Sequence, residues 1–186
     1  MCAIAGEVRF DTVIEDFMPW HDQMQQRQAR RGPDQAGRWH DQCCALLHRR
    51  LAVVDIDGGL QPMTADGVVL IYNGELYNAP ELRAELKAAG RSLHTHSDTE
   101  VVLQSFLQWG EGCCDRFNGI FAFAAWDTRR RQLFLARDPM GVKPLFYALR
   151  GTALVFGSEL KALLAHPLVE PEVDREGIYD LFFLGP

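Results

Sequence analysis

Short apolar runs separated by polar turns dominate the chain, and most of them have the length of a strand. Residues 3–10 alternate between apolar and polar side chains well enough to predict a strand. The run Val68–Tyr72 is apolar at every position, so it predicts a fully buried strand that ends at Asn73-Gly74. The other strand-like runs are residues 45–47, 51–54, 119–126, 132–137, 144–149 and 153–157.

Helix signals are grouped between these runs rather than placed after each of them. Pro19 is typical of a first helical turn, and Gly90 of the residue that follows a helix. Ser97-Asp98-Thr99-Glu100 has the spacing of a capping box. The predicted helices are residues 19–31, the segment from Asn78 to Gly90, a segment that starts at Ser97, residues 158–165 and a last one from near Asp174.

The order of these elements indicates the fold class. Strands come in runs and helices are grouped, without the strict strand–helix alternation that parallel sheets require. We therefore expect an α+β fold in which largely antiparallel sheets are covered by helices. The apolar segment Phe182-Phe183-Leu184 is typical of a chain cut at a domain junction.

Composition narrows the class of protein. Hydrophobic residues make up 47% of the 186 positions and charged residues 24%, as in ordinary globular proteins rather than disordered ones. The formal net charge is −6, so we expect neither nucleic acid nor a membrane as a partner. We find no apolar run of membrane-spanning length and no signal peptide, which predicts a cytoplasmic protein.

The cysteines and histidines do not predict a metal site. The chain has five cysteines, and two vicinal pairs, Cys43-Cys44 and Cys113-Cys114, rarely suit disulfide geometry. No Cys-x-x-Cys spacing occurs, and His94 and His96 are close in sequence without a third ligand. We expect free thiols in a reducing compartment and no bound metal.

Cys2 is the cysteine whose position suggests chemistry. Met1 is the kind of initiator residue that is removed when the next side chain is small, and Cys2 would then carry both a thiol and a free α-amine. An α-amine has a reference pKa of about 7.7–8.0, near the value of about 8.5 for a thiol, so it can accept the thiol proton. A nucleophile and its base would then belong to one residue.

Three further features have both a structural and a functional interpretation. Asn73-Gly74 is either a simple turn or an oxyanion hole, made by an amide side chain and an uncrowded backbone N–H. Arg50 is either a surface charge or a bidentate partner for a carboxylate. Asp98 is either an acid favoured by a helix dipole or a partner for an ammonium group.

Several motifs occur in a fixed order along the whole chain, and together they resemble a known family. They are Met1-Cys2-Ala3-Ile4-Ala5-Gly6, Arg31-Gly32-Pro33-Asp34, His48–Asp55, Asn73–Asn78, Ser97–Glu100, Phe117–Phe123, Arg137–Leu145 and Ser158–Leu163. This set resembles the class II glutamine amidotransferase domain, and within that family the amino-terminal half of glutamine-hydrolysing asparagine synthetases. The resemblance implies an N-terminal-nucleophile hydrolase fold, a four-layer αββα sandwich with two antiparallel sheets.

The resemblance also implies a role for each site residue. The Cys2 thiolate would attack the side-chain amide of glutamine, and Asn73 with the Gly74 N–H would hold the oxyanion. Arg50 would bind the carboxylate of the substrate, and Asp98, assisted by Glu75, would bind its ammonium group. The implied glutamine-binding residues are Arg50, Leu51, Val53, Val54, Asn73, Gly74, Glu75 and Asp98.

The same resemblance implies a partner for the ammonia that is released. Residues 1–172 would form the glutaminase domain, and residues 173–186 would begin a linker to a synthetase domain, downstream or in trans. No cofactor is expected in this chain, and ATP and Mg are expected only in that absent synthetase domain. A homodimer is compatible with this arrangement. Two alternatives stay open: an amidotransferase half for another acceptor, such as a sugar or a natural-product carboxylate, and a non-catalytic glutamine-binding module.

Overall fold

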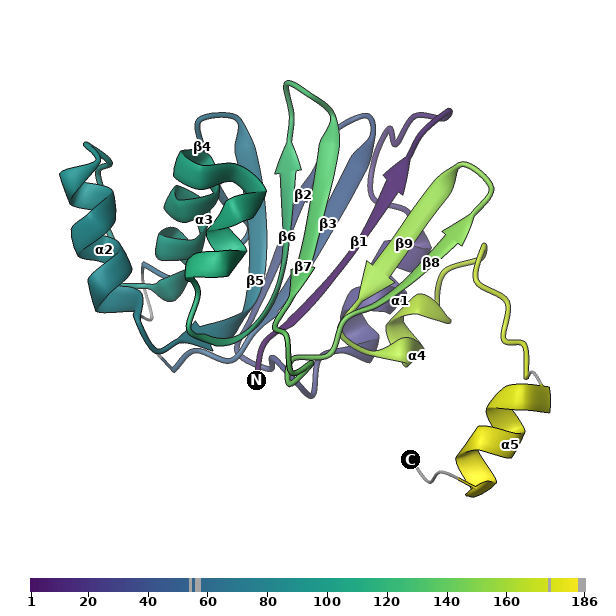
Figure 1. Cartoon of the computed structure of the whole chain (residues 1–186). Coiled ribbons are helices and arrows are strands. Elements are labelled where there is room, and N and C mark those ends of the chain that lie inside the picture. The colour runs from purple at the N-terminus through teal and green to yellow at the C-terminus, as the bar shows by residue number, and fades with distance from the viewer. Residues whose placement is uncertain (54, 56–57, 174, 184–186) are drawn as a thin grey trace.

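Two antiparallel β-sheets lie face to face at the centre of the structure, and helices cover the outer side of each (Figure 1). The structure is a computed structural model that describes residues 1–53, 55, 58–173 and 175–183. In spatial order, the first sheet contains β2 (Gln35–His40), β3 (Cys44–Arg50), β1 (Ala3–Arg9), β9 (Ala153–Gly157) and β8 (Phe146–Arg150). The second contains β4 (Met63–Ala65), β5 (Val68–Leu76), β6 (Gly119–Asp127) and β7 (Gln132–Arg137).

The helices form the two outer layers, which confirms the expected α+β class with four layers (Figure 1). The second sheet is covered by α2 (Ala79–Ala88) and α3 (Asp98–Trp109), which continues into a 3-10 helix, η1 (Gly110–Arg116). The first sheet is covered by α1 (Pro19–Arg27) and α4 (Leu160–Leu163). A final helix, α5 (Arg175–Phe183), lies apart from the sandwich.

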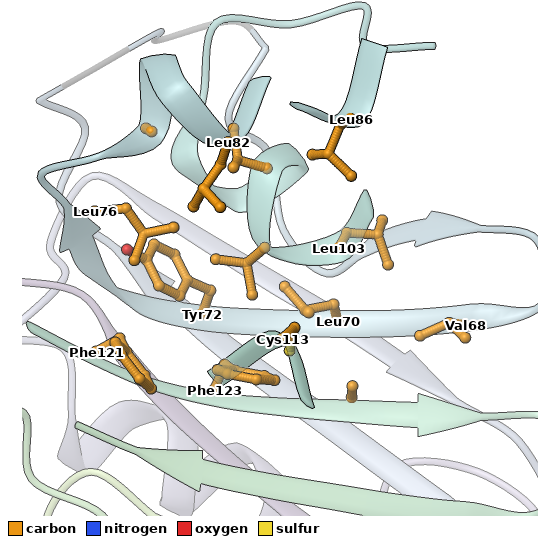
Figure 2. Close-up of a cluster of buried hydrophobic side chains, with 14 residues drawn as sticks. Val68, Leu70, Tyr72, Leu76, Leu82, Leu86, Leu103, Cys113, Phe121 and Phe123 are labelled. Atoms are coloured by element: carbon orange, nitrogen blue, oxygen red, sulfur yellow. The ribbon is translucent and has the colours of Figure 1, made fainter. Parts of the chain in front are cut away.

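Strand β5 explains the apolar run in the sequence, because it is buried on both faces. Leu70 and Tyr72 face the helix layer, where Leu82 and Leu103 contact them together with Phe123 (Figure 2). The alternate residues of β5 face the first sheet and pack with side chains of β1 and β3. These inter-sheet residues include Ile4, Val8, Leu46, Val69, Ile71 and Trp126.

One predicted strand end and one predicted strand are wrong. Strand β5 does not end at Asn73-Gly74 but continues to Leu76, with Asn73 opposite Ala122 of β6. Strand β6 offers backbone partners along the whole length of β5, so the Asn-Gly pair stays extended. The run at residues 51–54 is not a strand where the structure describes it, because residues 51–53 form a loop.

Two strands and the helix ends were also missed. Strand β2 is polar and partly exposed at the edge of its sheet, and β4 is three residues long, so neither gives an apolar signal. Helices α1 and α4 are shorter than predicted: residues 28–31 form turns after α1, and residues 158–159 and 164–165 lie outside α4. Within the described residues, no helix is long and apolar enough to cross a membrane.

A buried carboxylate joins the first sheet to its helices. Glu7 of β1 is 1% exposed, and its Oε2 accepts hydrogen bonds from Nε2 of His21 at 2.8 Å and from Nε1 of Trp20 at 3.1 Å. His166 places its Nε2 3.1 Å from the same oxygen, and Arg9 pairs with Oε1. Burial acts to raise the pKa of Glu7, but His166 and His21 together bring it well below its usual range.

We expect Glu7→Gln to lower the free energy of unfolding by about 2–4 kcal/mol at pH 7, because it removes one partner of a buried charged network. The depressed pKa makes the carboxylate stabilising above its ordinary value of 4.5 and progressively less so below it. Urea denaturation from pH 7 to pH 3 measures this. The difference in unfolding free energy between wild type and variant should shrink as the pH falls. A constant difference would contradict a stabilising role of the ionised Glu7 carboxylate.

Candidate active site

One cavity of about 240 Å³ contains the predicted site residues. It lies where the start of β1, the end of β5 and the first turn of α3 meet. The predicted residues on its wall are Cys2, Arg50, Leu51, Val53, Asn73, Gly74, Glu75 and Asp98. Val54 lies outside the described residues. A larger hollow, of about 1100 Å³, is lined by residues of the β6–β7 turn and the end of α3, and it contains none of the predicted residues.

Cys2 precedes the first residue of β1 and is partly buried. Its thiol points to the carbonyl oxygen of Leu51, with Sγ and O 3.7 Å apart. Arg31 donates from Nε to the carbonyl oxygen of Cys2 at 3.2 Å. The neighbouring residue pairs with Arg49 in the β1–β3 ladder. The thiol is therefore positioned by a central strand rather than by a loop.

Asn73 presents an amide group to the same cavity. It is 1% exposed, and its Nδ2 is buried without a hydrogen-bond partner among the described residues. Gly74 follows at a point of close approach, because a Cβ there would lie 2.6 Å from the Ile120 carbonyl oxygen and 2.7 Å from the Tyr72 ring. Only glycine fits this position without a shift of its neighbours. An unpaired donor on a rigid strand is suited to stabilising negative charge on a ligand oxygen.

Arg50 is the last residue of β3, and it is buried beside the loop that follows this strand. Arg50 donates from Nη1 to Oε1 of Gln35 at 2.8 Å and from Nη2 to the carbonyl oxygen of Asp55 at 2.6 Å. Two carboxylates hold this loop. Oδ2 of Asp34 accepts from the Ala52 N–H at 2.8 Å, and Oδ2 of Asp55 accepts from the His96 N–H at 2.7 Å. These bonds fix the guanidinium group at the cavity.

Asp98 starts α3 and belongs to the cavity wall. The Ser97 side chain caps the helix by accepting from the Glu100 N–H at 3.4 Å. Oδ2 of Asp98 accepts from the Leu76 N–H at 2.8 Å, which ties the helix to the end of β5. Burial raises the pKa of Asp98, against the effect of that hydrogen bond. The capping motif therefore positions a carboxylate as well as a helix.

The charges in the cavity suit a ligand that carries both signs. Arg50 and Lys143 are the basic residues on its wall, and Glu75 and Asp98 are the acidic ones. A guanidinium can bind a carboxylate through two hydrogen bonds, and carboxylates can bind an ammonium group. The cavity can therefore hold an amino acid near a thiol.

Several cavity residues were not assigned to the site from the sequence. Lys143 is 7% exposed, and its Nζ lies 3.6 Å from Sδ of Met1. Gln61 accepts from the Tyr72 N–H at 2.6 Å and donates to Oγ1 of Thr99 at 3.0 Å. Lys143 and Thr99 fall within family motifs, which were the available signal. Gln61 had none, because only the fold brings it to the site. Within the described residues, no group of His, Cys, Asp or Glu could hold a metal ion.

Comparisons with known proteins agree with this geometry. A family model described as a glutamine amidotransferase domain matches residues 1–185. Asparagine synthetase [glutamine-hydrolyzing] 3 of Bacillus subtilis is 48% identical over 190 residues, which cover 100% of this chain and 31% of that protein. Asparagine synthetase [glutamine-hydrolyzing] 1 of the same organism is 39% identical over 158 residues, covering 84% of this chain and 25% of that protein. The chain thus spans a third or less of the length of these relatives.

A solved structure gives the same result for the fold. Glutamine phosphoribosylpyrophosphate amidotransferase from B. subtilis superposes with a TM-score of 0.67 at 21% sequence identity. The match covers 87% of this chain and 43% of that chain. This likeness confirms the expected N-terminal-nucleophile hydrolase fold.

We expect His48 to make stability depend on pH. Its Nε2 donates to the Tyr72 carbonyl oxygen at 3.2 Å, and burial lowers the pKa of His48 to about 3 despite this bond. Below about pH 6.5, His48 therefore binds a proton in the unfolded chain but stays neutral in the folded chain. As the pH falls from 6.5, this residue should remove up to about 1.4 kcal/mol of unfolding free energy per pH unit.

The measurement compares wild type with His48→Gln by urea denaturation between pH 7 and pH 4. The variant lacks the titrating group. The amount by which its free energy of unfolding lies below that of wild type at pH 7 should therefore shrink as the pH falls. A pH-independent difference would show that His48 does not remain neutral in the folded state.

Proposed function

The chain belongs to the family of glutamine amidotransferase domains, and we propose that it hydrolyses glutamine to glutamate and ammonia with Cys2 as the nucleophile. The observation that carries this proposal is that one cavity holds both the Cys2 thiol and the buried Nδ2 of Asn73, which has no hydrogen-bond partner in the described part of the chain. A nucleophile and a preorganised donor for the resulting oxyanion are the two groups that acyl transfer from an amide needs.

The proposed reaction begins after removal of Met1. The α-amine of Cys2 takes the thiol proton, and the sulfur attacks the side-chain carbonyl carbon of glutamine. Asn73 Nδ2 and the Gly74 N–H stabilise the oxyanion. The C–N bond then breaks, and ammonia leaves with the proton returned by the α-amine. Water next hydrolyses the γ-glutamyl thioester, which gives glutamate and restores the thiol.

Two basic side chains lie beside Met1. Sδ of Met1 lies 3.6 Å from Nζ of Lys143 and 3.9 Å from Nη2 of Arg31. Arg31 also donates from Nε to the carbonyl oxygen of Cys2 at 3.2 Å, so it would remain beside Cys2 after removal of Met1.

The remaining residues would bind the substrate. Arg50 would hold the α-carboxylate, and Asp98 with Glu75 would hold the α-ammonium group. Leu51 and Val53 line the same cavity and would contact the rest of the substrate. Val54, which the resemblance also implies, keeps that predicted role without structural support.

The names of the relatives support a use for the ammonia. Both Bacillus subtilis relatives are named asparagine synthetases, and this chain corresponds to their amidotransferase half. We propose that residues 1–172 deliver ammonia to a synthetase domain that uses ATP and Mg, and that residues 173–186 lead toward it. All five cysteines are free, which supports a cytoplasmic location.

Replacement of the nucleophile provides the first test. Cys2→Ala should lower glutamate release by at least about a thousandfold, because no other group can form the thioester. A coupled glutamate assay measures this, with Cys114→Ala as the control because Cys114 is partly buried and lies outside the cavity. Undiminished glutamate release by Cys2→Ala would overturn the proposal.

The processing of Met1 is tested by mass spectrometry of the intact protein. An active preparation should lack Met1, and an electrophilic glutamine analogue should label Cys2 in a one-to-one ratio. A chain that keeps Met1, binds glutamine and remains unlabelled would instead be a glutamine-binding module.

Asn73 provides a second, independent test. Asn73→Ala should lower kcat by about 10²–10³-fold, the usual cost of losing one oxyanion donor. The KM for glutamine should change little, because the donor acts mainly in the transition state. Steady-state kinetics measure both constants. A large rise in KM with an unchanged kcat would make Asn73 a ground-state binding residue only.

A further inference from the structure

The hydroxyl of Tyr72, like the amide of Asn73, is buried and lacks a hydrogen-bond partner among the described residues. Tyr72 is 3% exposed, and among the described residues its Oη is buried without a hydrogen-bond partner. Both residues lie on the wall of the same cavity. Buried polar groups that lack a partner are few in native proteins, and each costs free energy. Two of them, adjacent in sequence and on one cavity, indicate that a ligand supplies the missing partners.

The phenol end of Tyr72 lies at the site rather than deep in the core. The side chain runs along β5 with its hydroxyl directed to the Leu76 end of the strand (Figure 2). The Cζ and Cε2 atoms of the ring lie 2.7 Å from the position that a Cβ on Gly74 would take. The hydroxyl is bonded to Cζ, so it lies close to Gly74, which lines the cavity.

The backbone of Tyr72 is fixed on both sides, so the ring has little freedom to turn away. Its N–H donates to Oε1 of Gln61 at 2.6 Å, and its carbonyl oxygen accepts from Nε2 of His48 at 3.2 Å. The ring itself packs in the core cluster between β5 and the helix layer. The hydroxyl is thus held in position before a ligand binds.

The surroundings of the hydroxyl indicate which part of a ligand it would meet. Burial raises the pKa of Tyr72, and the negative charges of Asp98 and Glu75 act in the same direction. Asp98 and Glu75 are the two acidic residues of the cavity. The hydroxyl therefore lies at the end of the cavity that suits a positively charged group.

We propose that Oη of Tyr72 accepts a hydrogen bond from the α-ammonium group of bound glutamine and so contributes to substrate specificity beside Asp98 and Glu75. This inference rests on the proposed function, because it takes glutamine as the ligand. An ammonium group has three N–H donors, so one hydroxyl and two carboxylates can satisfy it together. The hydroxyl adds an acceptor without adding a third negative charge.

Tyr72→Phe tests the proposal, because it removes only the hydroxyl. The KM for glutamine should rise about tenfold, as expected for the loss of a hydrogen bond to a charged group, while kcat stays within about twofold. The inhibition constant of 4-carbamoylbutanoate, which is glutamine without its α-amino group, should be the same for wild type and variant. Only a contact to the α-ammonium group gives this combination.

The unfolding temperature distinguishes the proposal from a structural role of the hydroxyl, because loss of a structural hydroxyl would lower it. Without ligand, Tyr72→Phe should keep or raise the unfolding temperature, because it removes a buried group that has no partner. The matched control is Tyr147→Phe on β8, where the side chain is 70% exposed, and it should leave KM and unfolding temperature unchanged.

Three outcomes would overturn the assignment of Tyr72: an unchanged KM for glutamine, an equal weakening of glutamine and 4-carbamoylbutanoate, or a marked fall in unfolding temperature. None of these affects the proposed function, which fails only if wild type releases no glutamate or Cys2→Ala releases as much as wild type.

Discussion

The packing of β1 against β5 across the space between the two sheets is the contact on which the site depends. Apolar side chains of both strands, such as Ile4 and Ile71, form one buried cluster there. Burial of each such side chain contributes about 1.5–3 kcal/mol, so the relative position of the strands is strongly fixed. Cys2 stands at the start of β1 and Asn73 lies within β5, so the same packing brings thiol and amide to one cavity.

Backbone-binding carboxylates complete the site around this scaffold. Asp34 and Asp55 hold the loop that follows Arg50, and Asp98 ties α3 to the end of β5. Oδ2 of Asp138 accepts from the N–H of Lys143 at 2.9 Å and so places that lysine on the cavity wall. The ligand-facing groups are thereby held before a substrate arrives, which lowers the entropic cost of binding and of catalysis.

Much of the fold was predictable because its signals are local. The apolar run of β5, the capping sequence at Ser97 and the glycine at position 90 each reflect short-range physical chemistry, and the structure confirms those elements. Strand β2 could not be predicted, because its polar residues become a strand only when β3 supplies backbone partners. The extended path through Asn73-Gly74 has the same origin, since pairing with β6 overrides the local turn preference.

The sequence by itself determined the family, the order of the elements and the residue types of the site, because those follow from motifs and from local patterns of polarity. The motifs identified Cys2, Asn73, Arg50 and Asp98 as candidate site residues, but they did not show that these residues lie close together. Only the tertiary structure decided that these residues share one cavity and that Tyr72 and Lys143 join them. The reason is physical: strand pairing and sheet packing act between residues far apart in the chain, and no local pattern records the distances that result.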